Sequence, residues 1–163
     1  MNDPMTILKA DHREVEKLLK SLADSEEGSQ REQEVEQLVA ALTLHMQLEE
    51  TLLYPLVEQH VGAEDEEEAE VEHGLARDGL SKVSSMTTAP GFGAVVEMLQ
   101  AGIKHHVKEE ETEILPELKD KMERAEWLAL GDAIVEAKAA AGMPVTTGTQ
   151  TRRSSKRKST SKK

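Results

Sequence analysis

The chain has no cysteine among its 163 residues. This excludes disulfide bonds, thiolate nucleophiles, iron–sulfur ligation and cysteine-type zinc sites, and leaves histidine and carboxylate side chains as candidate metal ligands. Aromatic residues are nearly lacking, since Tyr54, Phe92 and Trp127 are the only three. So few aromatic side chains argue against a base-stacking platform for single-stranded nucleic acid.

Long hydrophobic runs and a leader-like N-terminus are lacking as well. No run approaches the roughly 20 apolar residues that a membrane-spanning helix needs. The first four residues form neither a basic nor an apolar leader region. We therefore expect a soluble, cytoplasmic protein without membrane contact, and the length fits a single domain with a real core.

The abundant residues are Leu, Ala, Glu, Lys and Met, a composition that favours helices over sheet. Four segments place apolar residues three and four positions apart, and short breaks separate them. We predict an all-α protein, an up-down-up-down four-helix bundle over residues 1–142. The first helix should begin at Pro4 with Asp3 as its N-cap. An additional C-terminal helix, about residues 124–140, should pack across the bundle.

Charge is distributed unevenly along the chain. The net charge is −12, and all 32 acidic residues lie within residues 1–150, whereas seven of the 20 basic residues lie in residues 151–163. Residues 143–163 are rich in Ser, Thr, Lys and Arg without periodicity. We predict a disordered basic tail there, which either stays solvated or binds polyanions weakly.

The chain matches itself at an offset of 61 residues. Polar and proline positions share this offset: His12 with His73, His45 with His106, Glu49 with Glu110, Glu50 with Glu111 and Pro55 with Pro116. The His and Glu positions lie on apolar helical stripes, where burial of a polar group is costly unless it is paired or bound to a metal. A duplicated helix pair with two His and one Glu per copy suits a pseudo-two-fold dinuclear metal site in the bundle core.

The motif His-x-x-x-Glu alone carries little information, because five of the six histidines have a glutamate four residues later. The extended motif is more specific, since His-x-x-x-Glu-Glu-x-x-x-x-Pro occurs both at His45 and at His106. We interpret His60 as a helix C-terminal residue and His105 as a surface or supporting residue. Tyr54 is interpreted as an interfacial core residue.

At these residues the chain resembles the hemerythrin-like HHE cation-binding family over about residues 4–122. The resemblance implies a four-helix bundle with a non-haem di-iron centre, two iron ions joined by an oxo or hydroxo bridge. The implied metal residues are His12, His45, His73 and His106 as terminal ligands and Glu49 and Glu110 as bridging ligands.

Two positions depart from the oxygen-carrying members of that family. Those proteins have a further histidine four residues after the helix-three ligand, where this chain has Arg77. Their helix-four carboxylate follows its histidine by five residues, where this chain has Glu111. We prefer Glu110 as the helix-four ligand because it matches the internal repeat, and Glu111 is the alternative.

Imidazole and carboxylate ligands suit iron, manganese or zinc, and the resemblance ranks iron first. We predict a di-iron protein that binds or reduces dioxygen, hydrogen peroxide or nitric oxide, with a role in oxidative stress. If it is an enzyme, it is an oxidoreductase with catalase- or peroxidase-like activity. The alternative is a non-catalytic iron or oxygen sensor or an iron-handling module. A diatomic or peroxide ligand is expected, because packed helices should leave room for little else.

Overall fold

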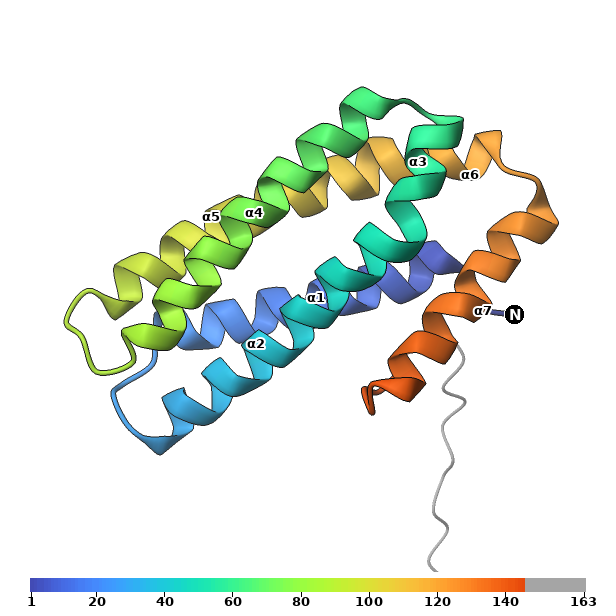
Figure 1. The fold of residues 1–163 in the computed structure, drawn as a ribbon. Coiled ribbons are helices and arrows are strands. Elements are labelled where there is room, and N and C mark those ends of the chain that lie inside the picture. The colour runs from blue at the N-terminus through green and yellow to red at the C-terminus, as the bar shows by residue number, and fades with distance from the viewer. Residues whose placement is uncertain (146–163) are drawn as a thin grey trace, which may run out of the picture.

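The computed structural model describes residues 1–145, which are predominantly helical and contain no strand (Figure 1). The elements are α1 (Pro4–Ala23), α2 (Ser29–Leu48), η1 (Glu49–Leu53), α3 (Tyr54–His60), α4 (Ala63–Ser85), α5 (Phe92–Glu109), η2 (Glu110–Ile114), α6 (Leu115–Lys121) and α7 (Arg124–Ala140). The predicted basic tail lies outside the described residues, apart from residues 143–145, and so does its expected binding of polyanions.

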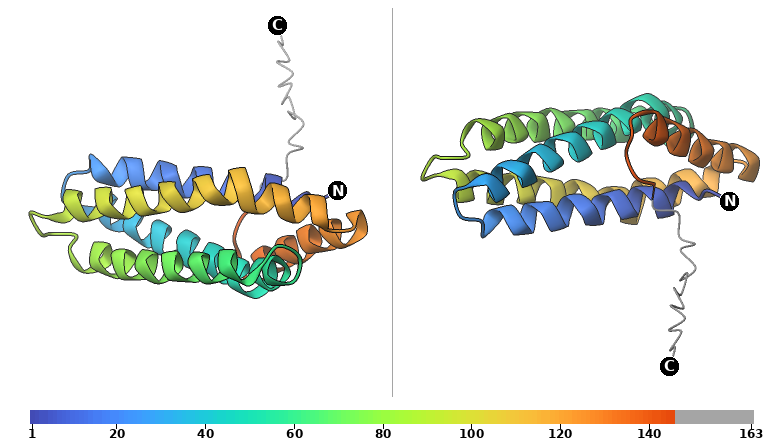
Figure 2. Two further views of the ribbon diagram at one scale, coloured as in Figure 1. Left: turned by 90° about the horizontal axis from the view of Figure 1, so that it is seen from above. Right: turned by 90° about the horizontal axis from the view of Figure 1, so that it is seen from below.

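Four long helical segments form the bundle: α1, α2 with η1 and α3, α4, and α5 with η2 and α6. Helix α1 packs against α2 and α5, and α4 packs against α5, α2 and α3. Helix α7 lies at the end of the bundle that holds the N-terminus (Figure 2). The predicted all-α four-helix bundle with an additional C-terminal helix is confirmed.

Helix α1 begins as the sequence predicts. Pro4 is its first residue, and the Asp3 carboxylate accepts a hydrogen bond from the backbone N–H of Thr6 at 3.0 Å. The same carboxylate accepts a hydrogen bond from the indole Nε1 of Trp127 at 2.7 Å. At Gly131 an added Cβ would lie 1.8 Å from the backbone oxygen of Asn2, so α7 needs a glycine to approach the N-terminal segment.

Two single π turns, η1 and η2, interrupt the second and fourth segments. Each begins at the repeated glutamate, and the carbonyls of Glu49 and Glu110 accept hydrogen bonds from the N–H groups five residues later. Pro55 and Pro116 follow directly, each as the second residue of the next helix. A widened turn avoids the clash between a proline ring and the carbonyl four residues earlier. The prolines thus explain where the π turns lie.

The π turns change which residues of the second segment face the core. An uninterrupted helix would bury Leu52 and Leu56, which continue the stripe of His45 and Glu49, but both are only half-buried. Leu53 and Val57 are fully buried instead. The buried stripe therefore shifts by one residue beyond Glu49, because a π turn inserts one residue and rotates everything beyond it.

The apolar core has two parts. One cluster, including Leu19, Leu38 and Leu99, fills the bundle toward the α1–α2 and α4–α5 connections. The other, including Val57 and Trp127, fills the end covered by α7. Buried polar side chains from all four segments lie between them. No helix within residues 1–145 is long and apolar enough to cross a membrane.

Candidate metal centre

The six predicted ligand residues meet in the middle of the bundle, and all six are buried. The histidines come one from each long segment: His12 on α1, His45 on α2, His73 on α4 and His106 on α5. Glu49 and Glu110 are the first residues of the two π turns. The π turns, which are frequent at functional sites, therefore begin at the two carboxylates that face the histidines.

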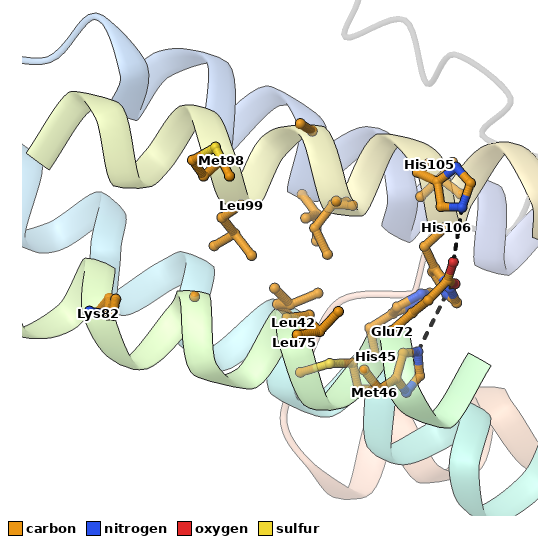
Figure 3. A pocket seen from close by; sticks show the side chains of 18 of the residues that line it. Leu42, His45, Met46, Glu72, Leu75, Lys82, Met98, Leu99, His105 and His106 are labelled. Atoms are coloured by element: carbon orange, nitrogen blue, oxygen red, sulfur yellow. Dashed lines mark hydrogen bonds and ion pairs between the residues drawn. The ribbon is translucent and has the colours of Figure 1, made fainter. Parts of the chain in front are cut away.

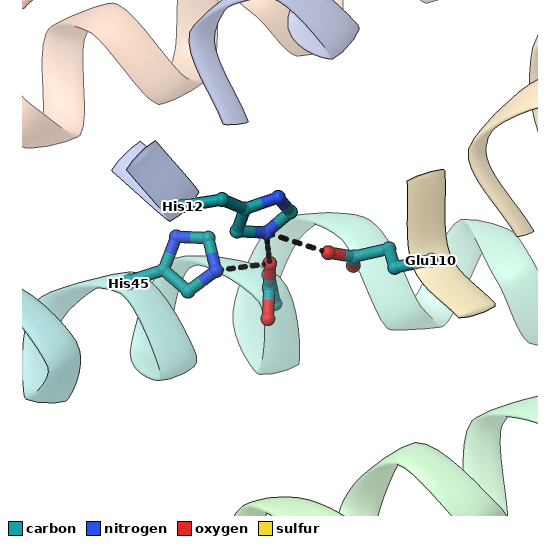
Figure 4. A group of neighbouring side chains, drawn as sticks. His12, His45 and Glu110 are labelled. Carbon is teal, nitrogen blue, oxygen red and sulfur yellow. Dashed lines mark ion pairs between the residues drawn. The ribbon is translucent and has the colours of Figure 1, made fainter. Parts of the chain in front are cut away.

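One group of potential ligand atoms comes from His12, His45, Glu49 and Glu110, all within 4.8 Å of one another. Nε2 of His45 lies 2.6 Å from Oε1 of Glu49, and Nε2 of His12 lies 3.0 Å from Oε2 of Glu110 (Figure 4). The two imidazole nitrogens thus face the carboxylates directly. Two nitrogens and two carboxylates around one point are a suitable donor set for a first metal ion.

A second group comes from Glu49, His73 and His106. Oε2 of Glu49 lies 3.0 Å from Nε2 of His73 and 3.6 Å from Nε2 of His106. Glu49 therefore faces the first group with one oxygen and the second with the other. Oε2 of Glu110, which lies beside His12, is also 4.0 Å from Nε2 of His106. Glu49 therefore lies between the two groups, and Glu110 belongs to the first group and approaches the second through the same oxygen.

The buried donor atoms of the first group lack hydrogen bonds. Within residues 1–145, seven buried side-chain atoms make none, and six of the seven belong to His12, His45, Glu49 and Glu110. Buried polar atoms are almost always hydrogen-bonded, and an unpaired one is costly. Five of these six atoms, all except the outward-facing Nδ1 of His45, face one another without directional hydrogen bonds, as ligand atoms around a common cation do. The residues present therefore fit a metal centre.

In the metal-free cluster, the buried carboxylates raise the pKa of the neighbouring histidines. Burial alone would lower the pKa of His12, but the carboxylates of Glu110 and Glu49 outweigh it and raise the pKa to about 10. The same opposition of burial and carboxylates raises the pKa of His106 to about 11. Burial and the Glu49 charge raise the pKa of Glu110. Protons are thus held where cations would bind, so metal binding must displace them.

Each histidine also faces a carboxylate through its other ring nitrogen, Nδ1. The pairs are His12 with Glu111 at 2.7 Å, His45 with Asp11 at 3.7 Å, His73 with Glu50 at 2.9 Å and His106 with Glu72 at 2.7 Å. These partners follow the internal repeat, since Asp11 and Glu72 are 61 residues apart, as are Glu50 and Glu111. Such carboxylates fix the ring orientation and raise the basicity of a metal-binding histidine.

Three of the outer carboxylates are held by cations, and one of them is Glu50, which accepts a hydrogen bond from Arg77 at 2.8 Å. Arg13 donates to Glu111 at 2.6 Å, and the buried Lys138 of α7 donates to Asp11. Glu111, the alternative helix-four ligand in the sequence, is thus placed on the outer nitrogen of His12, whereas Glu110 lies among the inner ligand atoms. The sequence preference for Glu110 agrees with this geometry.

Tyr54 lies at the centre, contrary to its interpretation as an interfacial core residue. Its hydroxyl is 3.0 Å from Nε2 of His73 and 3.3 Å from Oε2 of Glu49, and the side chain is buried. In a regular α-helix, a residue five positions after Glu49 would point well away from it. The π turn returns Tyr54 to the same face, and the repeated Glu–x–x–x–x–x–Pro spacing was the available signal.

The two remaining histidines lie outside the centre. His60 is the last residue of α3, and its Nε2 lies 3.4 Å from Glu126. His105 is 61% exposed and lies 3.2 Å from both Glu72 and Glu109. His105 therefore touches the centre only through Glu72, which also faces His106. Both positions agree with their interpretation from the sequence.

A model of the hemerythrin HHE cation-binding domain matches residues 3–118 of this chain. The chain belongs to the hemerythrin HHE cation-binding domain family. The predicted resemblance is confirmed, and membership in this family implies metal-cation binding, for which the buried His/Glu cluster has suitable ligands.

Individual relatives cover the hemerythrin-like bundle at low identity. A DNA nickase of Nostoc sp. is 26% identical over 117 residues, which are 71% of this chain and 33% of that protein. An uncharacterized hemerythrin-like protein of Schizosaccharomyces pombe is 26% identical over 132 residues, 78% of this chain and 65% of that protein. The chain thus matches less than two thirds of the length of either curated relative.

The fold is also that of a solved hemerythrin structure. A hemerythrin HHE cation-binding domain-containing protein from Mycobacterium kansasii matches with a TM-score of 0.76 at 22% identity. The match covers 87% of this chain and 89% of the other. At this identity the likeness supports the fold, and the site rests on the geometry of this chain's own residues.

This hemerythrin-like domain has Arg77 where the oxygen carriers have a further histidine. Its guanidinium donates to Oε2 of Glu50 at 2.8 Å, and Oε1 of Glu50 lies 2.9 Å from Nδ1 of His73. Arg77 therefore supports the orientation of His73 from outside. The group of His73 and His106 therefore has one histidine fewer than the oxygen carriers have. Tyr54 is the side chain that lies beside His73 instead.

The helices leave more room beside the centre than a diatomic or peroxide ligand needs. A cavity of about 810 Å³ reaches the centre and is lined by His12, His45, His73 and His106 at that end. The rest of its lining is mainly apolar and belongs largely to α4 and α5 (Figure 3). Small residues on both helices leave this space, and periodicity in the sequence does not show it.

Proposed function

We propose that this chain is a non-haem di-iron protein that binds or reduces a small oxidant, namely dioxygen, hydrogen peroxide or nitric oxide. The observation that carries the proposal is the pair of buried donor groups that share Glu49. His12 and His45 would hold one iron, His73 and His106 would hold the other, and Glu49 and Glu110 would bridge them. Imidazole and carboxylate ligands without thiolate suit iron, and manganese or zinc rank behind it.

The donor count supports a centre that accepts an external ligand. Four imidazole nitrogens and four oxygens of two carboxylates give fewer donors than two octahedral metals can use. A bound iron pair supplies two electrons to an oxidant, one from each ion. Apolar clusters lie on both sides of the site along the bundle, and such surroundings strengthen the electrostatic interactions inside it.

The side chains beside the centre have separable roles. Tyr54 can donate a hydrogen bond from its hydroxyl to Oε2 of Glu49 or to another oxygen at the same point. The outer carboxylates hold Nδ1–H of His12, His73 and His106, which leaves Nε2 of these rings free to bind a metal. Reduction of an oxidant needs protons, and His105 and Glu72 form a polar connection from the surface to His106.

The test is consumption of each oxidant by iron-loaded, reduced protein. We expect oxidation of the reduced protein by at least one of dioxygen, hydrogen peroxide and nitric oxide. His45→Ala should abolish the reaction, whereas His60→Ala, which changes a histidine outside the centre, should leave it unchanged. A fully iron-loaded protein that leaves all three oxidants unconsumed and unbound would contradict the proposal.

A second function is favoured by one contact. Asp11 lies beside His45 and is held by the buried Lys138 of α7, which connects the centre to the helix that closes the bundle. This supports a non-catalytic iron or oxygen sensor or an iron-handling module, in which metal occupancy changes the docking of α7. Metal should then protect α7 from proteolysis without oxidant turnover. Equal protease sensitivity and equal melting temperatures with and without iron would count against the sensor.

A further inference from the structure

The cavity beside the centre is an elongated apolar groove between α4 and α5. In Figure 3, His45 and His106 lie at one end of the groove. Leu42 and Leu75 lie between these histidines and the opposite, far end. Lys82 lies at that far end. The groove thus has polar groups at its two ends and an apolar stretch between them.

Small residues on α4 and α5 line the groove. Gly79 and Ala76 line it from α4, and Gly102 lines it from α5. Gly102 is exposed at the groove, and a Cβ added there would meet no atom within 4 Å, so open space lies beside this residue. A helix-interior glycine destabilises its helix by about 1 kcal/mol relative to alanine. Gly102 is therefore unfavourable for helix stability, and the space it leaves suits a ligand.

The rim of the groove exposes large apolar side chains. Leu75 is 67% exposed and Met98 is 75% exposed, and both line the groove. Val71 on α4 is similarly exposed at 65% but does not line it. An apolar rim that continues into an apolar interior suits a ligand with a hydrocarbon chain.

The size of the groove exceeds what the small oxidants need. Its volume of about 810 Å³ lies within the range of roughly 300–1,000 Å³ that is typical of small-molecule sites. A water-sized oxidant needs only about 30 Å³. A hydrocarbon chain would fill the apolar stretch, and its reactive end would lie at the four histidines.

We propose that this groove binds the alkyl chain of an organic hydroperoxide of the fatty-acyl type and presents its O–O group to the metal centre. The inference rests on the proposed oxidant reduction and names a substrate class for the same site. The O–O bond breaks, and two protons and two electrons convert the hydroperoxide to an alcohol and water. A reduced iron pair held by the four histidines and two glutamates would supply the two electrons. A fatty-acid carboxylate at the other end of the chain would lie near Lys82.

Binding is measured first, without turnover. The probe is cis-parinaric acid, a fluorescent polyene fatty acid, titrated into metal-free and iron-loaded protein and displaced by linoleic acid hydroperoxide. We expect saturable binding that Gly102→Phe weakens by about tenfold or more, because displacing even two methylene groups from the groove has that effect. Gly102→Ala should bind like the wild type and is the matched control.

A second pair of variants does not depend on filling the interior. Leu75→Asp places a charge on the apolar rim and should weaken probe binding by a similar factor. Val71→Asp introduces the same charge on the same helix at a similarly exposed position outside the groove, and it should bind the probe like the wild type. Because both residues are exposed, both variants should fold. Equal binding by all four variants and the wild type, or no binding by the wild type, would overturn the proposal.

Single-turnover oxidation of iron-loaded, reduced protein separates this inference from the proposed function. We expect Gly102→Phe to slow the reaction with linoleic acid hydroperoxide about tenfold while the reaction with hydrogen peroxide is retained. Reaction with hydrogen peroxide but not with the lipid hydroperoxide overturns the substrate assignment and leaves the proposed function standing. Groove-dependent probe binding without any oxidant reaction overturns the proposed function and retains the alkyl-chain site. The wild type could instead form a dimer that does not bind the probe, and Leu75→Asp could be monomeric. That result would overturn the inference and identify the groove as a self-association surface.

Discussion

Oε1 of Glu111 lies 2.7 Å from Nδ1 of His12, on the side of the imidazole ring away from the metal centre. The adjacent residue Glu110 lies 3.0 Å from Nε2 of the same ring. Two consecutive glutamates therefore hold one histidine from both sides. We infer different roles for them, since an inner carboxylate would bind the metal and an outer one would orient the ligand.

Replacement of these two glutamates separates the roles. Glu111→Gln should weaken metal affinity by about 10- to 100-fold, as loss of an outer partner typically does. Glu110→Gln should weaken metal affinity by a larger factor, because it removes a bridging carboxylate. The measurement is iron retention against a chelator, with the exposed Glu113→Gln as control. Equal losses from Glu110→Gln and Glu111→Gln would contradict the assignment.

Lys138 should matter for stability although it lies on α7, outside the four main segments. It is 4% exposed and donates to Asp11. Removing one partner of a buried ion pair leaves an uncompensated charge, so Lys138→Met should lower the free energy of unfolding by about 3 kcal/mol or more. Urea unfolding checks this, and the double variant with Asp11→Asn should recover part of the loss. A decrease in the free energy of unfolding below about 0.5 kcal/mol would contradict this, because it would mean that water solvates the Asp11 charge without Lys138.

Tyr54→Phe tests whether the phenol oxygen belongs to the centre. The substitution preserves packing and removes a hydroxyl that lies 3.0 Å from His73 and 3.3 Å from Glu49. We expect a changed absorption spectrum of the iron-loaded protein, together with a stability change of about 1 kcal/mol, as for one hydrogen bond. Identical spectra of the variant and the wild type would place the hydroxyl outside the metal environment.

The stability of the metal-free protein should fall as pH rises. The pKa of His12 is about 10 in the folded chain, against 6.5 for an unperturbed histidine. A raised histidine pKa stabilises the fold fully below the unfolded value, and this contribution is lost as pH rises through the folded value. The melting temperature of metal-free protein should therefore decrease between about pH 7 and 10, whereas metal binding should strengthen as its competing protons leave. A flat melting profile of metal-free protein over that range would contradict the electrostatics described above.

The sequence predicts the bundle and the six inner residues because both repeat. Helical periodicity identifies the segments, and the 61-residue offset pairs His12 with His73 and Glu49 with Glu110. Two of the outer carboxylates, Asp11 and Glu72, follow the same offset, because each directly precedes a ligand histidine. They look like ordinary surface acids in so acidic a chain, and only folding shows which ring each one faces.

Tyr54 and the groove could not be predicted in the same way. The position of Tyr54 depends on a π turn, and helical-wheel reasoning assumes a constant 3.6 residues per turn. The groove is lined by residues of α4 and α5, such as Ala76 and Gly102, which are separated in sequence. Such a space is a property of helix packing, so it is absent from the pattern of either helix alone.

The most direct test of the central claim is iron content per chain together with the near-ultraviolet spectrum of oxidised protein. The account predicts two irons per chain and an oxo-bridged charge-transfer band, both lost or greatly reduced in His45→Ala. Protein that binds no metal after anaerobic reconstitution with ferrous iron would contradict it, and the buried His/Glu cluster would then be a structural polar core.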